Sequence, residues 1–133
     1  MNVPEPDPST AIVFVAHGSR ADDANDAHVA LAHALANRVA PAVYPAFLEL
    51  AAPSIPDAID SAVNGGATTV VVLPYFLHPG RHLREHIPEI VAAAADRHPD
   101  CDVVLGSAFG DDHALIDVLV DQVHRATDGR SAG

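Results

Sequence analysis

The chain of 133 residues is long enough for one domain with an ordinary hydrophobic core. Its hydrophobic content of 49 % is typical of a folded globular protein rather than of a disordered chain. The formal net charge of −11 and the absence of lysine argue against nucleic acid as a partner, because phosphate binding needs a basic surface. No apolar run approaches the roughly 20 residues that span a bilayer, so we expect no membrane association.

A single cysteine excludes an intrachain disulfide. Cys101 stands beside a predicted strand, and we interpret it as a small, half-buried residue rather than a metal ligand. A chain without disulfides fits a reducing compartment, so we expect a cytoplasmic protein.

The two ends of the chain differ in composition from its middle. Residues 1–10 are polar and rich in proline, and residues 127–133 are similar, so we expect both to be disordered tails. The first segment has neither the basic nor the apolar region of a secretory signal. The sequence therefore predicts a single domain over residues 11–126.

Four apolar runs predict β-strands. They are residues 11–15, 42–48, 69–73 and 102–105. The first and third runs are continuous and rich in β-branched residues, as in the buried strands of parallel sheets. The second contains Pro45, which cannot donate a backbone hydrogen bond, so we expect an edge or bulged strand there.

A helix is expected after each strand. The first, over residues 22–39, has an apolar stripe at helical spacing, which would leave His28 and His33 on the surface. Pro41 would stop this helix. The stripe consists of Ala27, Leu31, Ala34, Leu35 and Val39.

The later helices have clear boundary signals. Ser54 is a good N-cap for the second helix, which would end at the Asn-Gly-Gly sequence of residues 64–66. The third would open at Pro88, or would begin at Leu83 and be disturbed by the proline, and would end near Arg97. The last helix would be capped by Asp111 or Asp112 and would bury one face, formed by Leu115, Val118, Leu119 and Val123.

Strands and helices thus alternate along the whole chain. Short connections with right-handed crossovers place such strands in one parallel sheet with helices on both faces. We therefore predict an α/β fold with a four-stranded parallel sheet. Ligands of such sheets bind outside the carboxyl ends of the strands, so the residues that follow each strand are the first functional candidates.

Histidines follow two of the predicted strands. His17 opens the sequence His-Gly-Ser-Arg after the first strand, and His82 lies between His78 and His86 after the third. The carboxyl ends of parallel strands meet at one edge of the sheet. We therefore expect His17 and His82 to meet in one crevice and to handle a divalent metal ion.

Glu49 leaves the second strand in the same direction. Two imidazoles and one carboxylate would form an open site that suits Fe, Co, Ni or Zn. Each residue also has a plainer interpretation. His17 can bond the backbone of a tight turn, His82 can be a solvated loop residue, and Glu49 can pair with an arginine.

Three of the seven cationic side chains lie in the two histidine clusters. They are Arg20, Arg81 and Arg84. A guanidinium group pairs well with carboxylates, so one interpretation is that they anchor an anionic ligand. The other interpretation is that they cap nearby acidic side chains of the protein itself.

Several common sites are absent. Neither Gly-x-x-x-x-Gly-Lys nor Gly-x-Gly-x-x-Gly occurs, which excludes the usual phosphate-binding loops. Ser19 is a weak candidate nucleophile because no Gly-x-Ser-x-Gly sequence surrounds it. One cysteine is too few for a structural zinc site of the usual type. Histidine phosphatases also have His-Gly after a first strand, but with an arginine where this chain has Ala16.

Three motifs occur in order. The first is Ala-His-Gly-Ser-Arg at residues 16–20, and the second is Ala-Phe-Leu-Glu-Leu-Ala-Ala-Pro-Ser at residues 46–54. The third lies within residues 72–88 and consists of Val-Leu-Pro-Tyr-Phe-Leu, Gly-Arg-His-Leu-Arg and Ile-Pro. Together they resemble the sirohydrochlorin chelatases of the CbiX/SirB type over about residues 11–125. The resemblance implies a flavodoxin-like chelatase fold. It also implies insertion of Co²⁺ or Fe²⁺ into sirohydrochlorin on the way to cobalamin or siroheme, while related small archaeal members use Ni²⁺.

The resemblance also implies roles for particular residues. His17 and His82 would be the catalytic metal-binding pair and Glu49 would assist, with the metal ion as substrate and no permanently bound cofactor. The chain resembles the short, single-domain form, which works as a homodimer. The expected substrate-binding residues are Ser19, Arg20, Arg81 and Arg84.

His78 and His86 depart from the family pattern. We expect both to be solvated, with a role as additional metal ligands as the alternative. Two other functions also stay open. A non-catalytic carrier or store of divalent metal would use the same histidines, and a hydrolase similar to the histidine phosphatases would release phosphate regardless of metal.

Overall fold

The computed structural model describes residues 4–132, and the side chains of residues 4–128. The strands are β1 (Asp7–Ala16), β2 (Pro41–Phe47), β3 (Thr69–Pro74) and β4 (Asp102–Leu105). They run parallel in one sheet with the order β2-β1-β3-β4, so β1 and β3 are central. The predicted α/β fold with a four-stranded parallel sheet is confirmed.

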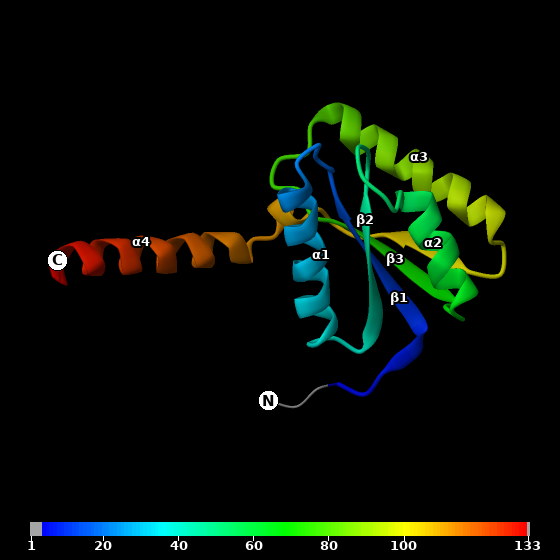
Figure 1. The fold of residues 1–133 in the computed structure, drawn as a ribbon, viewed down its shortest axis with the longest axis horizontal. Helices are drawn as coiled ribbons and strands as arrows, with labels where there is room; N and C mark the ends of the chain where they lie inside the picture. The colour runs from blue at the N-terminus through cyan, green and yellow to red at the C-terminus, as the bar shows by residue number, and fades with distance from the viewer. Residues whose placement is uncertain (1–3, 133) are drawn as a thin grey trace.

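The helices are α1 (Asp22–Ala36), α2 (Ile55–Asn64), α3 (Arg81–Arg97) and, after the short 3₁₀ turn η1 (Phe109–Asp111), α4 (Ala114–Ala132). Figure 1 shows α1 on one side of the sheet and α2 with α3 on the other. Helices therefore lie on both faces, as predicted. The carboxyl ends of the four strands point to the same edge, where the predicted site residues follow them.

The predicted N-terminal tail is wrong from Asp7 onward. β1 begins there, because the neighbouring strand segments supply partners for its polar first residues. Thr68 N, for example, donates to Ser9 O over 2.8 Å. Composition alone does not reveal this pairing, since it depends on neighbours far away in sequence. Residues 1–3 and 133 lie outside the described residues.

The main core lies between the sheet and helices α2 and α3. Alternate residues of the central strands, Val13 and Val15 in β1 and Val70 and Val72 in β3, are fully buried on this side, where Ile59 of α2 packs with them. This burial fixes the central strands and therefore the position of the loops that follow them.

Two predictions from local chemistry are confirmed. β2, which contains Pro45, is an edge strand of the sheet. Ser54 caps α2, because its Oγ accepts a hydrogen bond from Asp57 N over 3.2 Å. The helix then ends at Asn64 and is followed by Gly65.

The predicted apolar stripe of α1 is not its buried face. The helix ends at Ala36, before the predicted end at residue 39, and it buries His28 and Ala32. Leu31, in the middle of the predicted stripe, is 39 % exposed. The periodicity argument fails here because it treats histidine as polar and so displaces the expected face of the helix.

His28 is therefore buried, and the prediction that it lies on the surface is wrong, whereas His33 is exposed as predicted. The His28 ring stacks on Phe14 with centroids 4.7 Å apart, and its Nε2–H donates to Phe14 O over 2.9 Å. Burial lowers the pKa of His28, because the charged ring would lose its hydration. The neutral ring behaves as a flat apolar group with one satisfied donor.

The start of α3 also differs from the main prediction. The helix begins at Arg81 and contains Pro88, so the alternative of a helix that includes the proline is correct. Pro88 removes one backbone donor, to the carbonyl of Arg84. The buried side chains of Ile87 and Val91 hold the helix against the core on either side of that gap.

α4 does not cover the sheet. Figure 1 shows it running away from the domain, and no other helix or strand of the described residues packs substantially against it. The face predicted to be buried is in solvent, with Leu119 53 % and Val123 58 % exposed. The helix also continues past residue 127, where we predicted a disordered tail. No helix in the described part of the chain is long and apolar enough to cross a membrane.

The burial of His28 predicts a pH dependence of stability. Protonation would add an N–H at Nδ1, which is buried without a hydrogen-bond partner among the described residues. The folded-state pKa lies below the ordinary value of 6.5, so the unfolded chain takes up the proton first and stability falls as the pH drops below that value. Thermal unfolding followed between pH 7.5 and 5 measures this loss.

The matched variants are His28→Gln, whose amide can still donate to Phe14 O, and His33→Gln on the exposed side of α1. We expect His28→Gln to lose less stability than the wild type on acidification, and His33→Gln to follow the wild-type curve. Equal pH dependence of the wild type and His28→Gln would contradict the prediction.

Candidate functional site

His17 and Glu49 lie side by side at the carboxyl edge of the sheet. The His17 Nε2–H donates to Glu49 Oε1 over 2.9 Å, and both side chains are about half exposed. The contact arises because the pairing of β1 with β2 continues beyond both strands. Leu48 N donates to Ala16 O over 2.9 Å, and Glu49 N donates to His17 O over 3.1 Å. The prediction that Glu49 joins His17 at this edge agrees with this geometry.

Gly18 makes this close approach possible. Its φ of +99° lies in a region that side chains with a Cβ rarely adopt, and a Cβ there would overlap the main-chain carbonyl of Glu49. The glycine of the His-Gly-Ser-Arg sequence is therefore required for backbone geometry. Its place in the site is to let the loop after β1 contact the loop after β2.

Asn25 fixes the same loop from the first turns of α1. Its Oδ1 accepts from Ser19 N over 3.0 Å and its Nδ2 donates to Ser19 O over 2.7 Å. The Ser19 Oγ accepts from Ala21 N over 3.0 Å. Ser19, predicted to bind substrate, thus has a local role in shaping the turn. Sequence reasoning missed Asn25, although an Asn early in a helix that follows a Gly-Ser turn is a signal for such a clamp.

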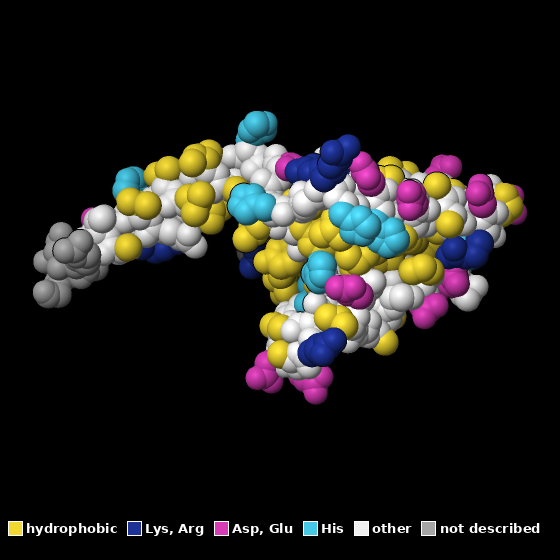
Figure 2. Space-filling view, turned by 90° about the horizontal axis from the view of Figure 1, so that it is seen from above, with side chains coloured by type: hydrophobic (Ala, Val, Ile, Leu, Met, Phe, Trp, Pro, Cys, Tyr) yellow, Lys and Arg dark blue, Asp and Glu magenta, His cyan; other side chains and the backbone are white. Residues whose placement is uncertain are grey.

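His82 lies in the first turn of α3 rather than in a loop. Its ring stacks on that of His86, one turn later, with centroids 5.7 Å apart. The His17 ring and the ring of Phe76, which precedes α3, are arranged edge to face with centroids 6.3 Å apart. Figure 2, which looks onto this edge of the molecule, shows histidine side chains around an apolar band.

The structure does not bring the three predicted metal ligands together. Among the described residues, no three His, Cys, Asp or Glu side chains are close enough to hold one ion. His17 contacts Glu49, and His82 contacts His86. The two pairs are thus separate in the single chain. His78 and His86 are exposed, as predicted.

The three arginines have different surroundings. Arg20 is exposed and has no acidic partner among the described side chains. Arg81 Nε lies 3.3 Å from Glu85 Oε1, one turn along α3, and its side chain is 93 % exposed. Both remain available to an anionic ligand. A pair as exposed as Arg81 and Glu85 adds little to stability.

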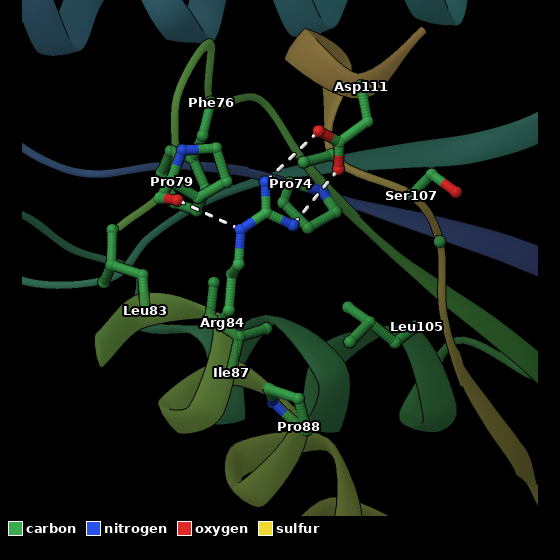
Figure 3. A pocket seen from close by; sticks show the side chains of 12 residues that line it. Pro74, Phe76, Pro79, Leu83, Arg84, Ile87, Pro88, Leu105, Ser107 and Asp111 are labelled. Carbon is green, nitrogen blue, oxygen red and sulfur yellow. Dashed lines mark hydrogen bonds and ion pairs between the residues drawn. The ribbon is translucent and has the colours of Figure 1, made fainter. Parts of the chain in front are cut away.

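Arg84 is held by the protein itself. Its guanidinium donates to both carboxylate oxygens of Asp111, at 3.2 and 3.4 Å, and its Nε donates to Pro79 O at 3.2 Å. Figure 3 shows this side chain crossing a pocket between α3 and η1. The pocket has a volume of about 190 Å³ and is lined mainly by apolar side chains such as Phe76 and Ile87. Of the two interpretations of the arginines, the capping of an acidic side chain describes Arg84.

The structure is thus an α/β domain with a parallel sheet, and an imidazole and a carboxylate are in contact at the carboxyl edge of that sheet. The profile of the CbiX family matches residues 11–126. The chain therefore belongs to the CbiX family of sirohydrochlorin chelatases.

Individual relatives agree with this membership. The sirohydrochlorin ferrochelatase of Priestia megaterium is 32 % identical over 121 residues, which are 90 % of this chain and 46 % of that protein. The sirohydrochlorin chelatase SirB of Bacillus subtilis subspecies spizizenii, solved in complex with cobalt, is 33 % identical with a TM-score of 0.76, over 90 % of this chain and 50 % of that one. This chain thus spans about half the length of both proteins.

A structure of similar length is also known. It is that of a protein from Marinobacter aquaeolei VT8 whose name assigns it to CbiX and to cobalamin (vitamin B12) biosynthesis. The match covers 90 % of this chain and 98 % of that one, with 27 % identity and a TM-score of 0.79. A solved structure of similar length therefore has a similar fold.

The role of Gly18 can be tested against a matched glycine. Gly66 has a similar φ of +106°, but a Cβ there would meet nothing within 4 Å. Gly66→Ala should cost about 1–3 kcal/mol of unfolding free energy through backbone strain alone. Gly18→Ala should cost at least about 1 kcal/mol more, because it also overlaps Glu49. Urea unfolding of both variants measures the difference, and equal losses would contradict the close contact.

Proposed function

We propose that this chain is a sirohydrochlorin chelatase, which inserts Co²⁺ or Fe²⁺, with Ni²⁺ as a third candidate, into the tetrapyrrole during cobalamin or siroheme biosynthesis. The observation that carries the proposal is the contact between His17 and Glu49 at the carboxyl edge of a CbiX-family domain. Relatives named as ferrochelatases and cobaltochelatases support it.

The chemistry of the reaction fits this pair. Insertion of a divalent ion releases two pyrrole N–H protons, so the site needs a group that accepts protons near neutral pH. In His17 the proton on Nε2 is held by Glu49, which leaves the lone pair of Nδ1 to hold the ion or to accept a proton. Partial exposure of both side chains suits an ion that must be handed on rather than kept.

His82 is the second proposed metal ligand, with His86 beside it as a possible addition. Both lie in the first turns of α3, and the His17 ring lies against Phe76, which precedes that helix in the chain. In this proposal the macrocycle lies on the apolar surface between the two groups. The ion enters from the side chains of His17 and His82, with Glu49 assisting, and no cofactor is permanently bound.

The arginines would orient the substrate. Sirohydrochlorin carries many carboxylates, and a chain of net charge −11 repels such a ligand unless cationic groups lie near the site. Arg20 and Arg81 are the exposed candidates, beside His17 and His82 in sequence. Arg84 would contact the substrate only after leaving Asp111. Ser19 would act through the shape of its turn.

The rest of the proposal concerns the setting of the enzyme. We propose a cytoplasmic homodimer whose partners are the tetrapyrrole and the metal ion. The apolar edge and the exposed histidines are open to a flat ligand on each copy. A protein of this charge has no evident surface for nucleic acid.

Removing either proposed ligand tests the function. His17→Ala and His82→Ala should each slow metal insertion by about 100-fold or more, because each removes an ion ligand or proton acceptor. His33→Ala, an exposed histidine on α1, is the control and should leave the rate unchanged. Anaerobic mixing with sirohydrochlorin and Co²⁺, followed by the visible spectrum, measures the rate.

Other outcomes identify the alternatives. Co²⁺ binding without any acceleration over the spontaneous reaction would indicate a carrier or store. Metal-independent release of phosphate from a phosphate ester would indicate a hydrolase. Full insertion rates in both His17→Ala and His82→Ala would remove the proposed site.

The role of Arg20 predicts a salt-dependent effect. Arg20→Ala should raise the KM for sirohydrochlorin several-fold at low ionic strength with little change in kcat, and the difference should shrink as salt screens the attraction. Arg38→Ala, which removes the same charge beyond the far end of α1, is the matched control. An unchanged KM for Arg20→Ala at low salt would exclude this role.

A further inference from the structure

α4 carries an apolar stripe that has no partner in its own chain. Ile116, Leu119, Val120 and Val123 recur at helical spacing, and each is between 43 % and 62 % exposed. Figure 2 shows hydrophobic side chains along this projecting helix. The opposite side carries Asp121 and Arg125, together with Val118, which is 48 % exposed. A helix with one apolar side is stable in water when that side is covered.

The sheet has an uncovered apolar face as well. Val70, Val72 and Val103 point toward α2 and α3. Their neighbours Val71 and Val104, which are paired in register, therefore point to the opposite face. Val104 is 47 % exposed, because α1 lies over β2 and leaves the β3–β4 half of this face open.

Aromatic side chains border the open face near the foot of α4. The rings of Tyr75 and Phe109 lie 5.0 Å apart, and both are more than one third exposed. A hollow of about 490 Å³ lies between Phe14, Leu73 and Phe109. Each chain therefore presents both an apolar helix face without a partner in the described residues and an open sheet face bordered by apolar and aromatic side chains. Exposed apolar surfaces of this kind mark interaction sites.

We propose that two copies of this chain exchange their α4 helices, so that the stripe of each α4 covers the β3–β4 face of the other copy. At 19 residues α4 is about 28 Å long, enough to cross the open half of the sheet. A second copy carries both surfaces, so a twofold arrangement forms two identical contacts, each between α4 of one copy and the sheet of the other.

The junction before α4 favours exchange over folding back. Only Asp112 and His113 separate η1 from α4. Asp112 N donates to Phe109 O at 3.2 Å, and Asp112 Oδ1 accepts from Ala114 N at 2.8 Å. These bonds direct α4 away from its own sheet. A short, ordered hinge disfavours a reversal within one chain and favours exchange between chains.

This inference deepens the homodimer of the proposed function and says how the copies meet. It rests on that homodimer but not on the metal chemistry. Its tests therefore measure molecular mass, and the inactive variants His17→Ala and His82→Ala are expected to stay dimeric. Loss of insertion activity and loss of dimerisation can thus be told apart.

The first test uses analytical ultracentrifugation of the full chain at micromolar concentration. The wild type should sediment as a dimer. Leu119→Asp should weaken dimerisation by about 100-fold or more, because it places a carboxylate in the middle of the apolar contact. Arg125→Gln lowers the net charge by the same amount on the opposite side of α4 and should remain dimeric. Circular dichroism should show retained sheet structure in both variants.

The second test separates exchange from a side-by-side dimer. Six Gly/Ser residues inserted between Asp112 and His113 would let α4 fold back onto its own sheet, and should give a folded monomer with little change in melting temperature. A monomeric wild type, or a Leu119→Asp variant that dimerises as tightly as the wild type, would overturn the α4 interface. A dimer of unchanged affinity after the insertion would overturn the exchange.

Discussion

The proposed site depends on backbone hydrogen bonds between β1 and β2 that continue beyond the ends of both strands. β1 and β2 end at Ala16 and Phe47, yet the hydrogen bonds between them continue to His17 and Glu49. The side-chain contact between an imidazole and a carboxylate follows from that continuation. The glycine at position 18 permits it, and the Asn25 clamp on Ser19 holds the loop in place. A helix and two strands thus fix one half of the proposed metal site before any ligand is present.

The other half has a different physical origin. His82 and His86 are presented by a helix, one turn apart, so their relative position is set by helical geometry rather than by sheet register. α3 owes its position to the burial of Ile87 and Val91 against the core. The two halves are attached to separate elements. Neither half forms a closed cage, which fits the proposed transfer of an ion to the tetrapyrrole.

Much of the fold was predictable from the sequence, because continuous β-branched runs and glycine or serine boundaries are local signals. The strand of residues 102–105, the cap at Ser54 and the edge position of the strand with Pro45 all follow from such signals. The failures at His28 and Asp7 have a common cause. Each depends on a partner distant in sequence, a Phe14 carbonyl in one case and flanking strand segments in the other, which a hydropathy pattern does not contain. For the same reason the motifs pointed to His17, Glu49 and His82, whereas their grouping into two pairs needed coordinates.

The ion pair between Arg84 and Asp111 joins two regions that serve different purposes. Arg84 lies two residues beyond His82, and Asp111 closes the turn that leads into α4. A reorientation at the start of α4 would therefore stretch or open this ion pair. The proposed metal site and the proposed α4 contact would then be coupled through this one ion pair.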